Sequence, residues 1–335
     1  MTEDPYATEF PVFVVGCARS GTTLLYHMLV SSGGFANYRA ETHLYDMILP
    51  RYGSLESPRE RLRMLRDWCS SRQASTVDFG VGDLREAVLQ DCRTGGDFLR
   101  ILMGHLAKKQ GVPRWAECTP LHLLYMDRIK SEIPDARFLH IVRDGRDVSL
   151  SLAKVGWVNP LPWDRAWKEV VAAWEWEWRV QAGRTLGRQL GGDYREVRFE
   201  DLVVDPESTL QSLEEFVAYP LDYDVILDNA VGTVAEPNTA FERSTRDGGS
   251  PSDFSPIGRW REHPDRESIT RMEETVGDSL EELGYEVNHR QEREIQLLPW
   301  RVRKGVYQKS RSLRQWIKDA TPLSRWLTRS YLDRA

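Results

Sequence analysis

Residues 11–23 read PVFVVGCARSGTT, an apolar run followed by a turn bounded by two glycines. The apolar run predicts a buried strand, and the segment after the turn predicts a helix. Gly16 and Gly21, with four residues between them, have the spacing of a phosphate-binding loop, in which backbone N–H groups and the positive end of a helix dipole face an anion. Nucleotide triphosphatases carry lysine directly after the second glycine, whereas here Thr22 stands at that position and the cation, Arg19, comes earlier.

The composition is that of one large globular domain. The chain has 335 residues, of which 41% are hydrophobic and 29% are charged, and its apolar runs are too short for a membrane helix. The N-terminus is acidic and lacks the layout of a signal peptide, so we expect a cytoplasmic protein. The four cysteines form no C-x-x-C pair and have no histidine at zinc spacing, which predicts free thiols and no metal.

Charge divides the chain into two parts, a main domain over 1–289 and a basic extension over 290–335. The extension contains twelve Lys and Arg residues against four Asp and Glu, so the rest of the chain carries a net charge of −14. An acidic body disfavours nucleic-acid binding. The extension reads as a basic amphipathic helix that lies on a membrane or docks onto the acidic body of its own chain or of a second copy, and we favour docking.

Further strand-like runs lie at 115–117, 138–142 and 194–199, mostly separated by helical patterns. Widely spaced strands joined through helices predict an α/β fold with a central parallel sheet and helices on both faces. Helices are expected after Thr119-Pro120, over 165–183, after Asp205 and over 271–283. The tryptophans of WEWEW at 174–178 are interpreted as core. Residues 236–257 are interpreted as a long loop, which at this length is either disordered or functional.

Five stretches in this order resemble the sulfotransferases that use 3′-phosphoadenosine 5′-phosphosulfate (PAPS). They are CARSGTTLL at 17–25, ECTPLHLLYMDRIKSEIPDARFLHIVRD at 117–144, FLHIVRDGRDVSLSL at 138–152, EVRFEDLVVDPESTLQSLEEF at 196–216 and IGRWREH at 257–263. The arginine-type loop is most similar to the bacterial and tyrosylprotein branches, since cytosolic members typically carry lysine at the Arg19 position. The resemblance implies a P-loop-like sulfotransferase domain over 1–289.

The resemblance also implies a site for PAPS and its product 3′-phosphoadenosine 5′-phosphate (PAP), without a metal. Arg143 and Ser151 would hold the 3′-phosphate, with Arg259 of the Gly-Arg-Trp element as a second candidate. The alternative for Arg143 is an ion pair with Asp144 or Asp147. The residues that would grip the 5′-phosphosulfate are those of the loop: Arg19, Ser20, Gly21, Thr22 and Thr23.

Two residues in AETHLY are candidates for the base that takes the acceptor proton. Glu41 lies where tyrosylprotein sulfotransferases place a catalytic glutamate, also followed by threonine. His43 is the alternative, because histidine titrates near neutral pH without a shift. The structural alternative is an exposed glutamate and a packed histidine.

This chain departs from the family at two positions, which leaves its activity open. Cys118 stands where lysine is expected, and Phe199 stands where tyrosine often precedes ED. The leading hypothesis is PAPS-dependent sulfonate transfer to a hydroxyl, or less favourably an amine, of a small-molecule or lipid-like acceptor. The alternatives are a P-loop kinase or nucleotide hydrolase, and a catalytically weak sulfotransferase-like binding protein.

Overall fold

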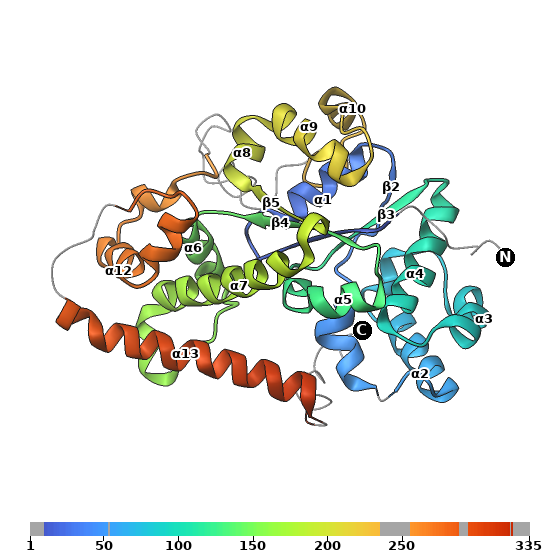
Figure 1. Ribbon diagram of the computed structural model, residues 1–335, viewed down its shortest axis with the longest axis horizontal. Coiled ribbons are helices and arrows are strands. Elements are labelled where there is room, and N and C mark those ends of the chain that lie inside the picture. Colours follow the sequence, from blue (N-terminus) through green and yellow to red (C-terminus); the bar gives the residue numbers. More distant parts are fainter. Residues whose placement is uncertain (1–9, 53, 235–254, 288–293, 322, 324–335) are drawn as a thin grey trace.

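A five-stranded parallel sheet forms the centre of the computed structural model, which describes residues 10–52, 54–234, 255–287, 294–321 and 323 (Figure 1). The strand order is β2-β3-β1-β4-β5, and each neighbouring pair is parallel. The strands are β1 (Val12–Gly16), β2 (Phe35–Ala36), β3 (Arg114–Cys118), β4 (Arg137–Val142) and β5 (Tyr194–Arg198). The predicted parallel α/β sheet is therefore confirmed, and the glycine-bounded turn leaves the sheet at the carboxyl end of its middle strand.

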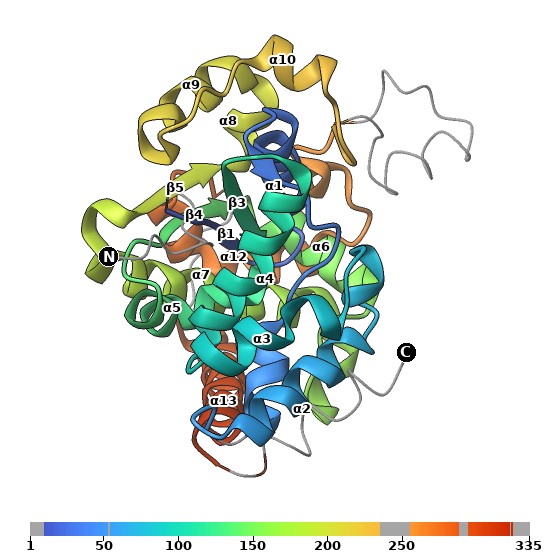
Figure 2. The same cartoon turned by 90° about the vertical axis from the view of Figure 1, so that its right-hand side faces the viewer.

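Helices cover both faces of the sheet because side chains alternate along each strand. Val12 and Val14 of β1 point to one cluster, and Phe13 and Val15 to the other. The first cluster lies under α1 (Thr22–Ser31), α8 (Phe199–Val204), α9 (Pro206–Val217) and α10 (Tyr223–Asp228). The second lies under α2 (Pro58–Cys69), α3 (Val81–Asp91), α4 (Gly95–Gln110) and α5 (Met126–Glu132). Figure 2 shows the two layers above and below the strands.

A third cluster joins the remaining helices around the tryptophans of α7. These helices are α6 (Gly145–Val155), α7 (Lys168–Leu190), α12 (Arg266–Glu282) and α13 (Glu294–Ala320). Of the tryptophans of WEWEW, Trp178 is only partly buried and donates to Ser312 at 3.1 Å, whereas Trp174 and Trp176 are fully buried, as the core interpretation predicted. They face different neighbours: Trp174 contacts Trp300 and Tyr307 of α13, whereas the Trp176 ring fits against Gly145, where a Cβ atom would lie 2.5 Å from it.

The basic extension docks along α7 of its own chain (Figure 1), which is one of the two forms of docking that the sequence left open. Two glutamates that alternate with the tryptophans hold it. Glu175 accepts from Tyr307 at 2.9 Å and pairs with Arg311 at 2.8 Å, and Glu177 pairs with Lys304 at 2.9 Å. The side of α7 that faces α13 therefore combines core packing with ion pairs.

Three helix boundaries differ from the sequence prediction. The Thr119 hydroxyl donates to Glu117 instead of capping a helix, and the chain makes a 3₁₀ segment (Pro120–Tyr125) before α5 begins. A second 3₁₀ segment (Pro162–Trp167) precedes α7. Asp265 accepts from the Ser268 amide at 3.1 Å and thereby starts α12 at Arg266 rather than at 271. Most of the predicted long loop (236–257), up to residue 254, lies outside the described residues.

The structure also bears on two expectations from composition. All four cysteines are free thiols, as predicted. None of the helices in the described ranges has both the length and the hydropathy needed to cross a membrane.

Candidate active site

The turn between β1 and α1 has the backbone of an anion-binding loop. Arg19 and Gly21 both have left-handed conformations, with φ angles of 75° and 99°, and the Ser20 amide donates to the Cys17 carbonyl at 3.1 Å. A left-handed non-glycine residue is strained, and such strain occurs preferentially at functional sites. The turn ends at the N-terminus of α1, where Thr22 and Thr23 begin the helix and its dipole favours negative charge.

Phe199 at the start of α8 packs directly against this turn. A Cβ atom at Gly21 would lie 2.3 Å from the Phe199 ring, and the Arg143 guanidinium lies over the same ring, 4.4 Å from its centroid. This packing uses the ring alone. Phenylalanine therefore fills the position where tyrosine is common without loss of these contacts.

We expect Gly21→Ala to destabilise the protein by about 3 kcal/mol, because left-handed backbone and an overlapping methyl group each cost roughly 1–2 kcal/mol or more. Urea unfolding measures the loss. Gly82→Ala in α3 is the matched control, since a Cβ atom there meets nothing within 4 Å and alanine favours a helix. Equal stability of the two variants would contradict the close approach of Phe199 to the turn.

Three arginines converge on the turn from three separate segments. Arg143 follows β4 and donates to the Arg19 carbonyl at 3.0 Å. Burial lowers the pKa of Arg19, and the positive charge of Arg259 lowers it further. Burial also lowers the pKa of Arg143. The carboxylates of Asp147 and Glu200 oppose this shift, and the positive charge of Arg259 increases it. Arg259 therefore lies close enough to repel both Arg19 and Arg143, as at a site built for an anion.

Several polar atoms at the turn are aimed at one another or left without a partner. The Ser151 hydroxyl accepts from Arg19 Nε at 2.9 Å, so Ser151 lies beside the side chain of Arg19. Ser20 Oγ and Arg143 Nε are buried and have no hydrogen-bond partner among the described residues. Buried polar atoms are nearly always satisfied in folded proteins, so these two atoms point to a missing polar ligand.

The Gly-Arg-Trp element is held by Asp147 at the start of α6. The Asp147 carboxylate accepts from the amides of Gly258 at 2.7 Å and Trp260 at 3.0 Å. Asp144 instead pairs with Arg146 at 2.8 Å. Both carboxylates proposed as alternative partners of Arg143 therefore have other partners, and the Asp147 contacts bring Arg259 to the turn.

Glu41, His43 and Asp46 form a continuous chain of ion pairs. His43 Nε2 lies 2.8 Å from Glu41 Oε2, and His43 Nδ1 lies 3.0 Å from Asp46 Oδ2. His43 has a left-handed φ of 48° and immediately precedes a π-helical segment (Leu44–Ile48), which turns Asp46 back toward the imidazole. Asp46 is fully buried, whereas Glu41 is 42% exposed, so the carboxylate of Glu41 is the end of the chain that solvent and ligands reach.

The two carboxylates decide the protonation state of His43. Burial disfavours the imidazolium, but the charges and hydrogen bonds of Asp46 and Glu41 outweigh it and raise the pKa of His43 to about 10. His43 is therefore an imidazolium at neutral pH, with both ring nitrogens donating to carboxylates. A histidine in this state has no free lone pair with which to accept a proton.

A second buried network lies behind this chain and was not predicted from the sequence. Glu117 in β3 accepts from His122 Nδ1 at 2.9 Å and from the Thr42 hydroxyl at 2.7 Å. His122 Nε2 lies 4.0 Å from Asp46. The network thus connects the sheet to Thr42 and Asp46, which lie on the two sides of His43 in the sequence.

Cys118 at the end of β3 lies between the two halves of the site. Burial raises the pKa of its thiol well above the usual range, the nearby Glu41 carboxylate adds to the effect, and a hydrogen bond with Thr22 opposes it. The group is therefore a neutral thiol next to both the turn and Glu41. Cys118 thus lies near Glu41, which is 18 positions beyond Thr23, as well as beside Thr22 at the N-terminus of α1.

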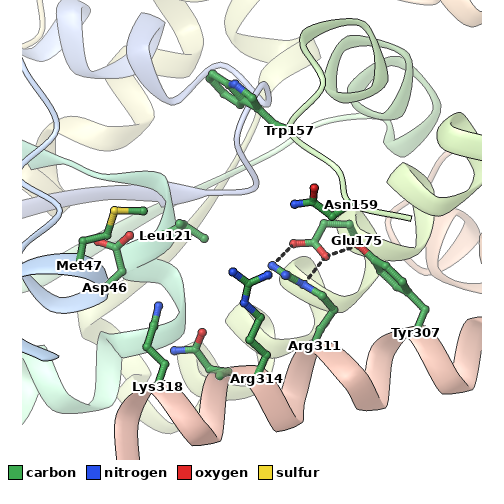
Figure 3. A pocket seen from close by; sticks show the side chains of 11 residues that line it. Asp46, Met47, Leu121, Trp157, Asn159, Glu175, Tyr307, Arg311, Arg314 and Lys318 are labelled. Carbon is green, nitrogen blue, oxygen red and sulfur yellow. Dashed lines mark hydrogen bonds and ion pairs between the residues drawn. The ribbon is translucent and has the colours of Figure 1, made fainter. Parts of the chain in front are cut away.

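A cavity of about 200 Å³ adjoins the site on the side of α13 (Figure 3). Trp157, beyond the end of α6, lies 6.0 Å from the Arg19 guanidinium, and Asp46 is on the opposite wall. The lining residues are Asp46, Met47, Leu121, Trp157, Asn159, Glu175, Tyr307, Arg311, Arg314, Gln315 and Lys318. Sequence analysis identified none of them as site residues, because the cavity exists only where α13 packs against distant segments.

The described parts of the chain contain no group of three or more His, Cys, Asp or Glu side chains arranged to hold a metal. The site is instead lined by cations, hydroxyl groups and backbone amides at the turn, with one exposed carboxylate, Glu41, beside them.

Comparison with known proteins identifies the family of this arrangement. The profile described as "Sulfotransferase family" matches residues 11–223. Protein-tyrosine sulfotransferase A of Caenorhabditis elegans is 22% identical over 291 residues, which cover 86% of this chain and 70% of that protein. Protein-tyrosine sulfotransferase of Drosophila melanogaster is 25% identical over 290 residues, covering 84% of this chain but only about half (53%) of the relative.

Solved structures share the fold. The sulfotransferase domain from the curacin biosynthetic pathway superposes with a TM-score of 0.51 at 17% identity, covering 83% of this chain and 98% of that domain. The sulfotransferase domain from the Synechococcus PCC 7002 olefin synthase has a TM-score of 0.50 at 18% identity, with coverage of 84% and 97%. At this level of identity the likeness concerns the fold.

Proposed function

The chain belongs to the sulfotransferase family, and we propose that it moves a sulfonate group from PAPS to a hydroxyl group of its acceptor, with Glu41 as the base. It is an enzyme of sulfonate transfer. The proposal adds the donor, the chemical group that accepts, and the residues that act.

The convergence of Arg19, Arg143 and Arg259 on the N-terminus of α1 carries the proposal for the donor. Like charges are brought together at a cost, which a bound polyanion would offset. Ser20 Oγ and Arg143 Nε, which lack partners among the described residues, supply two further hydrogen-bonding atoms for such a ligand. The residues present therefore fit a donor that is anionic at both its 5′ and 3′ ends.

The roles divide between the two ends of the site. The turn, with Arg19 and the hydroxyls of Ser20, Thr22 and Thr23, would hold the 5′-phosphosulfate. Arg143 and Arg259 would hold the 3′-phosphate, and Ser151 would adjoin both ends, given its contact with Arg19. When bound, PAPS supplies the sulfonate group and a phosphate leaving group.

Arg19 is the residue best placed to stabilise negative charge on the leaving phosphate. Its guanidinium lies beside the turn, and arginine can donate two parallel hydrogen bonds to phosphate oxygens. Cys118 is a neutral thiol and cannot supply the charge that lysine gives at this position in relatives. The positive charge near the transferred group therefore comes from Arg19, with backbone amides as additional donors.

Glu41 would take the proton from the acceptor hydroxyl. It is the exposed member of its ion-pair chain, and its charge acts on the Cys118 thiol, which adjoins the turn at Thr22. His43 donates to Glu41 from Nε2 and would hold the carboxylate in one orientation, while Asp46 holds His43 from behind. This arrangement supports Glu41 as the base and His43 as its positioning residue.

We expect His43→Asn to destabilise the protein by about 3 kcal/mol at pH 7, because the buried Asp46 loses its partner. Asparagine tolerates the left-handed backbone at this position. The raised pKa of His43 means that its stabilising effect is complete below its ordinary pKa of 6.5 and disappears as pH rises through about 10. The difference between wild type and variant in urea unfolding should therefore vanish above about pH 10.

His263→Asn serves as the control for this prediction. Its ring lies 3.5 Å from Glu169 near the surface, a contact of the kind that contributes less than about 1 kcal/mol. A stability gap for His43→Asn that persisted at high pH would contradict the ion-pair chain.

The acceptor is proposed to be a hydroxyl compound, with an amine as the less favoured alternative. Both matched relatives are named as protein-tyrosine sulfotransferases, so their acceptor group is a phenolic hydroxyl. A carboxylate base with a histidine partner suits removal of a hydroxyl proton during transfer.

Thermal shift with nucleotides tests the donor. PAP at 100 times its Kd should stabilise the protein by about 2.7 kcal/mol, and ATP with magnesium should stabilise it less. The reverse order would favour a kinase or hydrolase and contradict the proposal. Labelled PAPS then distinguishes an enzyme from a weak binding protein: transfer of the label to a hydroxyl acceptor is the expected result.

A further inference from the structure

The cavity beside α13 carries an inference about the acceptor, which rests on the proposed function. We infer that the acceptor is a small hydroxyl compound with an anionic group, a carboxylate, phosphate or sulfate, which Arg314 and Lys318 of α13 bind. The observations concern where the cavity lies, which of its charges are already paired, and how its walls are composed.

The cavity lies beside the residues proposed to act on the acceptor and the donor. Asp46 on one wall contacts His43, which in turn contacts Glu41. Trp157 on the other side lies over Arg19 at 6.0 Å and is 59% exposed. The lining residues include neither Glu41 nor a residue of the turn, because the His43 ring separates Asp46 from Glu41. A compound held at α13 would therefore extend beyond the cavity, past His43 and Trp157, to bring its hydroxyl to Glu41 and the turn (Figure 3).

The acidic groups that face the cavity already have cationic partners. Glu175 pairs with Arg179 at 2.7 Å and with Arg311 at 2.8 Å, and it accepts from Tyr307. Asp46 pairs with His43. Neither carboxylate is therefore available as the principal partner of a further cation in the cavity.

Two cations of α13 remain. Figure 3 shows Arg314 and Lys318 extending from α13 into the space between Asp46 and Glu175. Neither has a carboxylate within ion-pair distance among the described residues; the nearest aromatic contact of Lys318 is the Tyr125 ring at 5.5 Å. Burial lowers the pKa of Lys318. The negative charges of Asp46 and Asp319 oppose this shift, whereas the positive charges of Arg311 and Arg314 increase it. An anion between Arg314 and Lys318 would offset the cost of burying the Lys318 charge and the repulsion between the two cations.

The walls and the size of the cavity limit the rest of the acceptor. Met47, Leu121 and Trp157 supply an apolar and aromatic surface between the two ends. A cavity of about 200 Å³ is below the roughly 300–1,000 Å³ of drug-sized ligand pockets. It therefore suits a compact compound that places its hydroxyl near Glu41 and its anionic group near α13.

The cationic wall lies outside the part of the chain that the family profile matches. The profile ends at residue 223, whereas Arg314 and Lys318 lie in α13 (Glu294–Ala320). Recognition of the anion would thus be a property of the C-terminal segment of this chain.

Matched pairs of acids and their amides test the inference, because they differ in charge but little in shape. Suitable pairs are hydroxyphenylpropionate, glucuronate and hydroxyhexanoate, each with its amide, titrated calorimetrically into the full chain with and without PAP. We expect at least one acid to bind about 10-fold or more tightly than its amide, as a charge-assisted hydrogen bond provides. With labelled PAPS, kcat/KM should favour the same acid.

The variant Arg314→Gln/Lys318→Gln should reduce the acid-to-amide ratio of that pair to about 1. Lys309→Gln is the control, because Lys309 is an exposed cation of α13 that does not line the cavity, and it should keep the wild-type ratio. Equal binding of acid and amide in every pair, or a ratio unchanged in the double variant, overturns the inference. Failure of PAP to bind would instead contradict the proposed donor, and the titrations without PAP would still decide the question of the anion.

Discussion

Arg19→Ala should reduce kcat/KM for sulfonate transfer by about 10³-fold or more. Removal of one preorganised charge-stabilising donor typically costs about 10²–10³ in rate, and here Cys118 offers no second cation. Alanine inherits the left-handed backbone at this position, so the change removes the guanidinium rather than the turn. Arg19→Lys should recover part of the activity, because it restores the charge without the bidentate geometry.

Steady-state kinetics with labelled PAPS measure this effect, and circular dichroism verifies the fold. Arg59→Ala provides the matched control, since Arg59 is an exposed arginine of α2. Activity of Arg19→Ala within about tenfold of wild type would show that another group stabilises the leaving phosphate.

Glu41→Gln should lower kcat by about 10²–10⁴-fold, the usual contribution of a positioned base, while PAP still binds. Glutamine can accept a hydrogen bond from His43 Nε2 but cannot take a proton at neutral pH. The loss should be larger than that of His43→Asn, which removes the positioning residue and leaves the carboxylate. Measurement of kcat for both variants under saturating donor decides the order.

Glu56→Gln controls for the loss of one carboxylate, since Glu56 is 73% exposed and its contact with Arg93 is 3.9 Å long. If His43→Asn were the less active variant, with PAP binding and stability taken into account, the assignment of the base to Glu41 would be wrong.

The donor side of the site was predictable because its signals are local. An apolar run, two glycines and a helix predict the turn, and Arg143 follows a strand whose apolar pattern is evident. Sequence order then predicts a parallel sheet in which these ends lie together. The geometry agrees: Arg143 donates to the Arg19 carbonyl, and Ser151 accepts from the Arg19 side chain.

The acceptor side was not predictable in the same way, because it depends on contacts between distant segments. The sequence does not show that the π-helical segment places Asp46 against the imidazole of His43, a contact on which the proposal of Glu41 as the base depends. The sequence predicts only that Glu117 is a strand residue, although its carboxylate accepts hydrogen bonds from Thr42 and His122. The cavity exists only because α13 lies against α7. The charge pattern predicted that the basic extension docks, but not where on the chain it does so.

The attachment of α13 has a consequence for how substrate preference can change. The sheet and the turn are built from residues before 223, whereas α13 joins them through side-chain contacts such as those of Tyr307 and Lys304 with α7. Mutations on the cavity side of this helix therefore leave the catalytic groups untouched. Substitutions in this one terminal helix would therefore change which acceptor binds without changing the groups proposed to transfer the sulfonate.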